Sequence, residues 1–365
     1  MYGMEIEWEM DSLKEILTKA VESGASDVFI IAGAPLSYKT NGHILPQYEE
    51  KVLPELSERL IRQIYEIAGR PIDRLLALGD DDFAFALPGL SRFRASTYKQ
   101  RGSLAAVIRI ITFGIPDYRE FGILDEVMRV SERTKGLVLV TGPAGGGKST
   151  TLACIIDRIN ATREGHIITL EEPIEFLHRN KKSVVSQREV ELDTQNYVTA
   201  LRACLRQAPD VILLGEMRDL ETIQTAMTAA ETGHLVISTL HTVGAANTID
   251  RVVDVFPPEQ QQQIKIQLAM LLQTVVSQQL VPTVQGGLVP AFEIMHVTSA
   301  VRTMIREGKV HQIDTVIASS APSGMVSMDA SLLDLFHKGM ISEEIAIRYA
   351  VNTEMMGKRV KGAKL

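Results

Sequence analysis

The spacing of hydrophobic residues in the first third of the chain predicts a small unit of mixed helix and sheet. Apolar residues recur three and four positions apart from Leu13 to Val21, which indicates a helix that stops at Gly24. Apolar and polar residues alternate along residues 83–87 and 93–97, as they do in antiparallel strands with one solvated face. Further strands are expected at residues 28–31, on either side of an Asn41-Gly42 hairpin turn, and at residues 104–111 after a turn at Gly102.

The pattern changes after residues 112–122, where periodicity lapses into glycine, proline and charged residues that indicate a linker. Beyond it, continuous apolar runs typical of buried parallel strands alternate with helical spacing. The expected strands are residues 137–140, 167–170, 211–214 and 235–238, and the expected helices include residues 197–205 and 220–230. This alternation predicts a doubly wound α/β nucleotide-binding core.

The last part of the chain is predicted to be mostly helical. From Pro258 the spacing predicts one long helix that reaches Leu280, and Gly286-Gly287 predicts a turn between two short extended segments. The expected organisation is an N-terminal α/β domain of residues 1–112, a linker of residues 113–122 and a nucleotide-binding domain of residues 123–365 that turns helical from about residue 286.

Composition narrows the classes of function. Apolar residues make up 45% of the 365 residues, which is ample for a core. The formal net charge of −7 argues against a general affinity for the nucleic-acid backbone, so no nucleic-acid partner is expected. Residues 1–11 lack the apolar segment of a signal peptide, and no run reaches the length of a membrane span. We expect a cytoplasmic protein that reaches a membrane only through a partner.

The two cysteines, Cys154 and Cys204, lie on expected helices and far apart in the sequence. Their spacing fits neither a metal site nor a disulfide framework. Buried structural cysteines in a reduced compartment are therefore expected.

The strongest chemical signal is a complete GxxxxGK[ST] phosphate loop between an expected strand and an expected helix. Glycine lets backbone N–H groups turn inward around phosphate oxygens, and the helix start adds positive dipole. Lys148 would reach the β- and γ-phosphates of ATP, and the Ser149 hydroxyl would hold Mg²⁺. The predicted nucleotide-binding residues are Gly142, Pro143, Ala144, Gly145, Gly146, Gly147, Lys148, Ser149 and the following Thr150.

Carboxylates follow two of the expected core strands. Glu216 is the first carboxylate after residues 211–214, and Gly215 occupies the usual Walker B aspartate position, so Glu216 is expected to act on Mg²⁺ through water. Glu171, Glu172 and Glu175 cluster after residues 167–170. Such a cluster is commonly solvated surface, but its place in the nucleotide core favours a role in catalysis.

Two histidines and several arginines complete the candidates. His241 follows the strand of residues 235–238 at its carboxyl end, where it can face the γ-phosphate, whereas His234 lies at the start of that strand and ranks lower. Arg92 and Arg94 share one strand face, and Arg101 and Arg109 follow. The residues leave two interpretations of these arginines open: scattered solvent charge, or arginine fingers that complete a site in a ring.

Three further motifs resemble those of one protein family. Residues 168–176 look like its aspartate box, residues 213–222 like its atypical Walker B motif, and residues 232–234 with 239–242 like its histidine box. Residues 300–307 resemble its C-terminal element linked with retraction. The chain is thus similar, over nearly all residues after the first ten, to the secretion-type hexameric ATPases, and specifically to the type IV pilus retraction ATPases of the PilT family.

This resemblance implies a PAS-like N-terminal domain, a RecA-like motor domain and a homohexamer with nucleotide between the domains. By motif position Glu175 corresponds to the catalytic glutamate, Glu216 to the Walker B carboxylate and His241 to the residue near the γ-phosphate. His234 of the histidine box is included among the nucleotide-binding candidates, and Arg94, Arg101 and Arg109 lie on the strands that carry the family's arginines. The implied partners are an inner-membrane platform protein and the pilus assembly machinery, which would hold the protein peripherally at the inner membrane.

Some residues depart from the family's pattern. Glu172 replaces the usual aspartate, and the extra methylene alters a direct metal contact but not one through water, so Glu172 is a further candidate on the metal side. Ala144 and Gly146 stand where threonine and serine are common, which leaves backbone cradling intact. Activity is therefore expected.

Three alternatives to a retraction motor remain. Pilus extension and type II secretion ATPases carry an additional N-terminal region and generally a tetracysteine zinc insert; this chain has room for neither, so no zinc is expected. An accessory ring that binds ATP but hydrolyses it weakly stays open because of Glu172. A nucleic-acid translocase is disfavoured by the net charge.

Overall fold

The computed structural model describes residues 12–40, 42–111 and 114–362. The chain divides into two compact units, one of residues 1–114 with residues 175–177, and one of residues 115–174 with residues 178–365. Each unit is described by itself. Three sequence predictions concern residues outside the described ranges: the N-terminal residues 1–11, Asn41 of the hairpin turn, and residues 112–113 of the linker.

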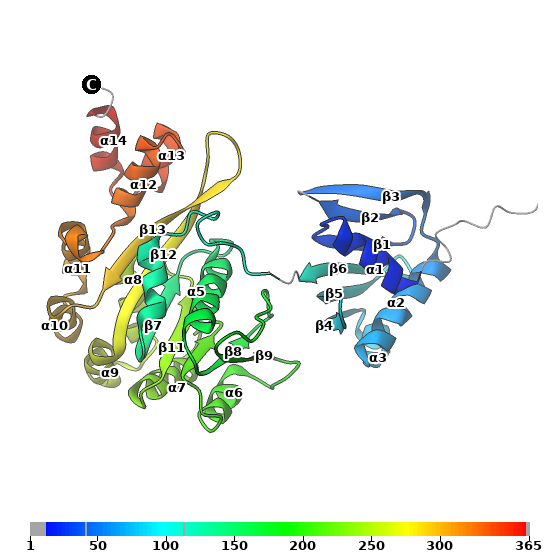
Figure 1. The fold of residues 1–365 in the computed structure, drawn as a ribbon, viewed down its shortest axis with the longest axis horizontal. Helices are drawn as coiled ribbons and strands as arrows, with labels where there is room; N and C mark the ends of the chain where they lie inside the picture. The colour runs from blue at the N-terminus through cyan, green and yellow to red at the C-terminus, as the bar shows by residue number, and fades with distance from the viewer. Residues whose placement is uncertain (1–11, 41, 112–113, 363–365) are drawn as a thin grey trace, which may run out of the picture. The chain divides into compact units, whose positions relative to one another are not determined.

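The N-terminal unit is an antiparallel sheet with helices packed against it (Figure 1). Its six strands lie in the order β3-β2-β1-β6-β5-β4. The strands are β1 (Asp27–Ile31), β2 (Pro35–Thr40), β3 (His43–Lys51), β4 (Asp80–Leu87), β5 (Ser91–Gln100) and β6 (Ser103–Ile111), and the helices are α1 (Leu13–Glu22), α2 (Pro54–Ala68) and α3 (Asp73–Leu78). The helix expected from Leu13 and the strands expected around residues 28–31, 83–87, 93–97 and 104–111 are confirmed.

Local chemistry explains how this unit begins and packs. Ser12 caps α1 in a capping box with Glu15, which satisfies two backbone donors at the helix start. The Ser57 hydroxyl of α2 donates to the Leu104 carbonyl of β6 at 2.6 Å and ties helix to sheet. Phe93 of β5 is fully buried in the resulting core.

The C-terminal unit is a mostly parallel sheet with helices on both faces (Figure 1). Its seven strands lie in the order β13-β12-β7-β11-β10-β8-β9, and β13 runs antiparallel to β12 at one edge. The strands are β7 (Gly136–Thr141), β8 (His166–Glu171), β9 (Val184–Glu189), β10 (Val211–Leu214), β11 (Leu235–Leu240), β12 (Leu272–Pro282) and β13 (Leu288–His296). The predicted α/β class and RecA-like core are confirmed.

The helices follow from helical spacing and divide between the two faces of this sheet. They are α4 (Asp125–Met128), α5 (Lys148–Thr162), α6 (Tyr197–Cys204), α7 (Leu220–Glu231), α8 (Ala245–Asp254), α9 (Pro258–Leu271), α10 (Ser299–Glu307), α11 (Ile313–Ser319), α12 (Met328–His337), α13 (Glu343–Tyr349) and α14 (Thr353–Gly362). Val138 and Val140 of β7 are buried with α5, whereas Leu137 and Leu139 are buried with α6 to α9 on the opposite face. Each such fully buried side chain contributes about 1.5–3 kcal/mol to folding.

One sequence prediction about this unit is wrong. The helix expected from Pro258 to Leu280 ends at Leu271, and the chain continues as β12, which pairs with β7 and β13. The β-branched residues Thr274, Val275 and Val276 favour a strand, and all three are buried between neighbouring elements. The turn expected at Gly286-Gly287 joins β12 to β13, but these strands are long rather than short.

The C-terminal helices form a smaller cluster. Residues of α12, α13 and α14 pack on Val281 of β12 and Val289 of β13. In the described part of the chain, no helix combines the length and the apolar character that crossing a bilayer requires.

Candidate active site

The phosphate loop (residues 142–149) lies where β7 ends and α5 begins, at the carboxyl edge of the parallel sheet. β7 is buried at every position between β11 and β12. No described side chain caps the first turn of α5, which begins at Lys148. Uncapped N–H groups together with the helix dipole attract anionic oxygen atoms, so this helix start suits a phosphate group.

Two glycines of the loop are required by the neighbouring strand β12. Gly142 has a φ of 144°, and a Cβ there would lie 1.9 Å from the Gln278 carbonyl oxygen. Gly147 has a φ of 82°, and its Cβ would lie 2.7 Å from Nε2 of Gln278. Gly145 also has a positive φ, 72°, but nothing lies within 4 Å of its Cβ position. Backbone geometry and β12 together therefore shape the loop.

Side chains within and beside the phosphate loop add further hydrogen bonds. Lys148 Nζ donates to the carbonyl oxygens of Gly142 and Pro143 at 2.8 and 2.9 Å, which keeps the ammonium group within the loop. The Thr151 hydroxyl donates to Oε1 of the buried Gln278 at 2.6 Å. The sequence reasoning missed Gln278 because it placed this residue in a helix; a glutamine after a run of valines was the available signal.

Glu216 lies just beyond β10, at the same edge of the sheet, because β10 lies between β8 and β11. Its carboxylate is buried and forms an ion pair with Arg218. The hydrogen bond to Glu216 raises the pKa of Arg218. His241 Nε2 lies 3.3 Å from the second oxygen of Glu216. The structure thus brings together two of the predicted residues, Glu216 and His241.

The structure explains why glycine stands at position 215, where aspartate is usual in a Walker B motif. Its N–H donates to the Leu170 carbonyl at 2.8 Å, and its carbonyl accepts from the Thr239 hydroxyl at 2.6 Å. A Cβ at this position would lie 2.8 Å from the hydroxyl of Tyr197. An aspartate at position 215 would collide with that hydroxyl, so the carboxylate moves one residue on, to Glu216.

Tyr197, at the start of α6, was missed by the sequence reasoning. Burial raises the pKa of this phenol, and the charges of Glu172, Glu216 and Glu171 raise it further. The phenol therefore stays protonated among the carboxylates and can act as a hydrogen-bond donor there. Nothing in the local sequence separates this tyrosine from one that packs in the core.

The acidic loop (residues 171–178) leaves the end of β8 beside β9. The Glu171 carboxylate accepts from the Thr169 hydroxyl at 2.6 Å and from Gln187 Nε2 at 3.1 Å. Glu172 and Glu175 are exposed. The cluster thus separates into one carboxylate tied to the sheet and two that face solvent.

The two candidate histidines lie at opposite ends of β11. His241 follows the carboxyl end, next to the phosphate-loop edge, because Thr141 pairs with Leu240. Nδ1 of His234 lies 3.0 Å from the Ala229 carbonyl and 3.0 Å from the Thr232 hydroxyl, at the end of α7. Within its own unit, His234 therefore stabilises a helix end and does not contact the phosphate loop.

The candidate arginines lie on β5, β6 and the turn between them. Arg94 pairs with Arg109 across the two strands, and Arg109 forms an ion pair of 3.2 Å with Asp27. Arg101 is exposed in the turn, with a φ of 49°. Within the described residues, neither Arg94 nor Arg101 has an acidic side chain at ion-pair distance, so these two are better placed to take an external anion than Arg109.

The oxygen ligands near the phosphate loop fit Mg²⁺. In the described ranges no group of three or more His, Cys, Asp and Glu side chains is arranged to hold a metal ion. Mg²⁺ fits this arrangement because it keeps several waters and takes phosphate oxygens with few protein ligands. The Ser149 hydroxyl is available for direct contact, and Glu216, which already contacts Arg218 and His241, is suited to contact through water.

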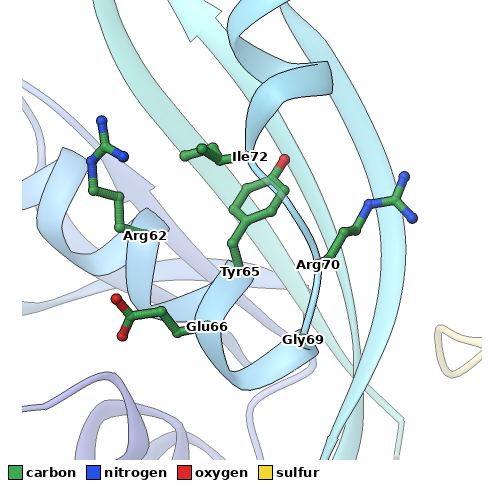
Figure 2. A pocket seen from close by; sticks show the side chains of 6 residues that line it. All are labelled: Arg62, Tyr65, Glu66, Gly69, Arg70 and Ile72. Atoms are coloured by element: carbon green, nitrogen blue, oxygen red, sulfur yellow. The ribbon is translucent and has the colours of Figure 1, made fainter.

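A cavity of about 380 Å³ lies in the N-terminal unit near the end of α2 (Figure 2). Arg62 beside it pairs with Glu58 at 2.6 Å, and Arg70 pairs with the buried Asp81 at 2.9 Å. Burial raises the pKa of Tyr65 to about 12, and its hydroxyl donates to Asp81 at 3.1 Å. These charges are already paired, so the cavity does not compete with the phosphate loop for a nucleotide.

Both cysteines are buried on helices, as expected. Burial raises the pKa of each thiol to about 11, so Cys154 and Cys204 stay protonated and unreactive.

Comparisons with known proteins extend over most of the chain. Residues 7–322 match the family model described as type II/IV secretion system protein. The chain is 45% identical over 342 residues to the type IV pilus retraction ATPase PilT of Pseudomonas aeruginosa, covering 92% of this chain and 96% of that protein. It is 48% identical over 276 residues to the twitching motility protein of Neisseria gonorrhoeae, covering 75% and 74%. A crystal structure of the pilus retraction motor PilT with bound ADP aligns with a TM-score of 0.87 at 43% identity, covering 94% of this chain and 98% of that one.

Proposed function

The chain belongs to the type II/IV secretion system protein family, and from that premise we propose that it is an ATP-hydrolysing motor that powers type IV pilus retraction. The observation that carries the ATPase activity is the phosphate loop between β7 and α5, with the buried Glu216 at the end of β10 on the same edge of the sheet, where β11 lies between the two strands. The retraction role is supported by similarity over nearly the whole length of a retraction ATPase.

Nucleotide binding is assigned to the phosphate loop. The uncapped start of α5 and the loop N–H groups would receive the phosphates, and Lys148 would exchange its two carbonyl contacts for phosphate oxygens. Ser149 would hold Mg²⁺ directly and Glu216 through water, with Glu172 as a further candidate. When bound, the ion offsets negative charge on the phosphates.

Hydrolysis is assigned to the acidic loop. Glu175 would orient or deprotonate the attacking water, a role that an exposed carboxylate in the loop after β8 can perform. His241, linked to Glu216, would respond to the γ-phosphate. Arg94 or Arg101 of the N-terminal domain would supply positive charge to a nucleotide in the assembled ring, with Arg109 as the third candidate.

The working assembly is proposed to be a cytoplasmic homohexamer. It would associate peripherally with the inner membrane through the pilus platform protein and act within the pilus assembly machinery. Rotation of one domain on the other during hydrolysis would supply the mechanical step.

The first test is Mg²⁺-dependent ATP hydrolysis combined with sizing. We expect a hexamer whose activity is lost in Lys148→Ala and reduced about 100-fold or more in Glu175→Ala. A monomer, or hydrolysis untouched by Glu175→Ala, contradicts the ring-motor assignment. Nucleotide binding with negligible hydrolysis in the wild type favours an accessory ring.

The second test concerns the direction of the motor. Deletion of the gene is expected to leave bacteria with excess surface pili and no twitching motility, and the wild-type gene should restore both. Bacteria without pili after deletion would indicate an extension motor.

A further inference from the structure

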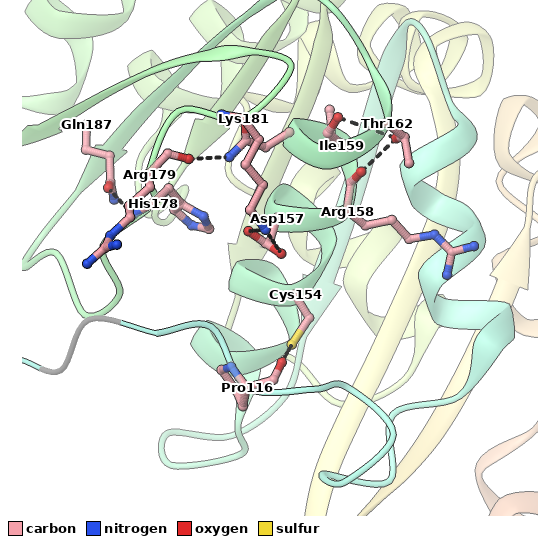
Figure 3. Close-up of polar contacts among 11 residues, drawn as sticks. Pro116, Cys154, Asp157, Arg158, Ile159, Thr162, His178, Arg179, Lys181 and Gln187 are labelled. Carbon is pink, nitrogen blue, oxygen red and sulfur yellow. Dashed lines mark hydrogen bonds and ion pairs between the residues drawn. The ribbon is translucent and has the colours of Figure 1, made fainter.

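The acidic loop is held at two points by side chains of the edge strand β9. The Ile174 N–H donates to Oε2 of Glu189 at 3.0 Å. The His178 N–H donates to Oε1 of Gln187 at 2.8 Å, a contact that Figure 3 shows. Glu175 lies between these two anchored positions. Both anchors are side chains, whereas the ladder between β8 and β9 ends at the pair Glu171 and Glu189.

Burial and hydrogen bonds hold Glu189 in one position. It is buried, and burying a carboxylate is costly unless hydrogen bonds to it compensate. Its N–H donates to Oδ2 of Asp193 at 2.8 Å, and the Asp193 N–H donates back to the Glu189 carbonyl at 2.8 Å. The turn after β9 therefore fixes the backbone from which the carboxylate reaches Ile174.

Gln187 uses both ends of its amide. Its oxygen accepts from the His178 N–H, and its Nε2 donates to Glu171 at 3.1 Å. The amide thus links the first residue of the acidic loop to the last one. The side chain of Ile174, the residue immediately before Glu175, is also buried, which fixes the backbone on that side of Glu175.

We propose that Glu189 and Gln187 are positioning residues that set the place of the Glu175 carboxylate for ATP hydrolysis. This inference rests on the proposed role of Glu175. A displacement of about 1 Å of a catalytic group costs up to about 100-fold in rate, and β9 is the element that prevents such a displacement. Neither residue lies in the motifs that indicated the active site.

The test separates positioning from general stability. Glu189→Ala removes the acceptor for the Ile174 N–H, and kcat is expected to fall at least about 10-fold with KM for ATP and the Kd of a fluorescent ATP analogue unchanged. Glu189→Gln keeps an acceptor oxygen and is expected to recover most of kcat. Glu191→Gln removes an exposed carboxylate from the same turn and serves as the control.

A double variant ties the effect to Glu175. If Glu189 acts through Glu175, then Glu189→Ala adds nothing to the loss caused by Glu175→Gln. If the two losses of kcat multiply in the double variant, or if KM for ATP rises as much as kcat falls, the inference is overturned. If Glu175→Gln alone leaves hydrolysis intact, it is the proposed function that fails. Should Glu189→Ala not fold, Gln187→Ala tests the second anchor with the same readouts, and an unchanged kcat there counts against the proposal.

Discussion

Two loops at the same edge of the parallel sheet obtain their shapes in different ways. The phosphate loop is shaped by its own glycines and by one adjacent strand, with Gly142 pressed against Gln278. The acidic loop has no glycine, and its backbone is held by the side chains of Gln187 and Glu189. The glycines of the phosphate loop are recognisable as a local motif, whereas nothing in the acidic loop itself indicates the β9 side chains that hold it.

The difference also separates what each loop tolerates. In the phosphate loop, changes at single glycines act directly on the backbone that would meet phosphate. In the acidic loop, the carboxylates of Glu172 and Glu175 are exposed, and the position of the backbone that carries them depends on the anchors on β9. Four predictions test this contrast.

The largest effect is expected within the phosphate loop. Gly142→Ala puts a Cβ 1.9 Å from a backbone oxygen of β12 and should cost more than about 3 kcal/mol, lowering affinity for a fluorescent ATP analogue about 100-fold or more. Gly145→Ala, where only the positive φ opposes a side chain, should cost about 1–2 kcal/mol. Equal losses of affinity in the two variants would show that the fit to β12 is unimportant.

The second effect concerns the exposed carboxylates of the acidic loop. Glu175→Gln keeps the size of the side chain but removes the base, so kcat should fall about 100-fold with nucleotide affinity retained. Glu172→Asp shortens an exposed side chain and should change kcat less than about threefold, as expected for contact through water. Steady-state hydrolysis and nucleotide titration measure both. A large rise of kcat in Glu172→Asp would instead indicate that this carboxylate contacts the metal ion directly and that the wild-type glutamate slows hydrolysis.

The third effect lies between the loops, at Gly215. Gly215→Ala brings a Cβ within 2.8 Å of the Tyr197 hydroxyl and should lower the free energy of unfolding by about 1–3 kcal/mol. Removing that hydroxyl in the double variant Gly215→Ala/Tyr197→Phe should recover at least half of the loss. Urea unfolding of both variants, with Tyr197→Phe alone as control, measures this coupling. Additive losses would mean that the nearby backbone, not the phenol, excludes a side chain.

The same contrast explains what could be predicted from the sequence. The phosphate loop and the parallel strands around it follow from local patterns, because continuous apolar runs and a glycine motif encode them directly. The contact of Glu216 with His241 requires knowing which strand ends are neighbours. The order of the strands is a property of the whole sheet, so the sequence indicated these residues as candidates but did not indicate their contact.

The missed elements share a physical cause. β9 is an edge strand with half-exposed positions, so it lacks the apolar run that identifies central strands. β12 carries glutamines at positions 273, 278 and 279, so it lacks the continuous apolar run that is typical of a core strand. Gln278 and Glu189 look like ordinary polar residues, and only the fold reveals that they are buried beside the two loops.

The smallest effect is the contribution of one histidine of the acidic loop to the pH dependence of stability. His178 ends this loop, and burial lowers its pKa to about 4. The charge of Asp157 opposes this shift in part, and the charge of Lys181 adds slightly to it. The neutral imidazole is favoured in the folded state, so its contribution is complete above the unfolded pKa of about 6.5. Below that value the unfolded chain takes up a proton first, and stability falls until about pH 4.

The expected loss over this window is about 1–3 kcal/mol in the free energy of unfolding. His178→Gln cannot titrate, so the difference between wild type and variant should shrink from pH 7.5 to pH 5 in urea unfolding. The exposed His337, replaced in His337→Gln, provides the matched control and should leave the pH dependence unchanged. Because His178 lies outside the phosphate loop, the difference in nucleotide affinity between wild type and His178→Gln should stay constant over this range, whereas the difference in kcat should change as the acidic loop loosens. A parallel fall of affinity and kcat would mean that acid weakens both loops, and that the anchors on β9 are not what distinguishes them.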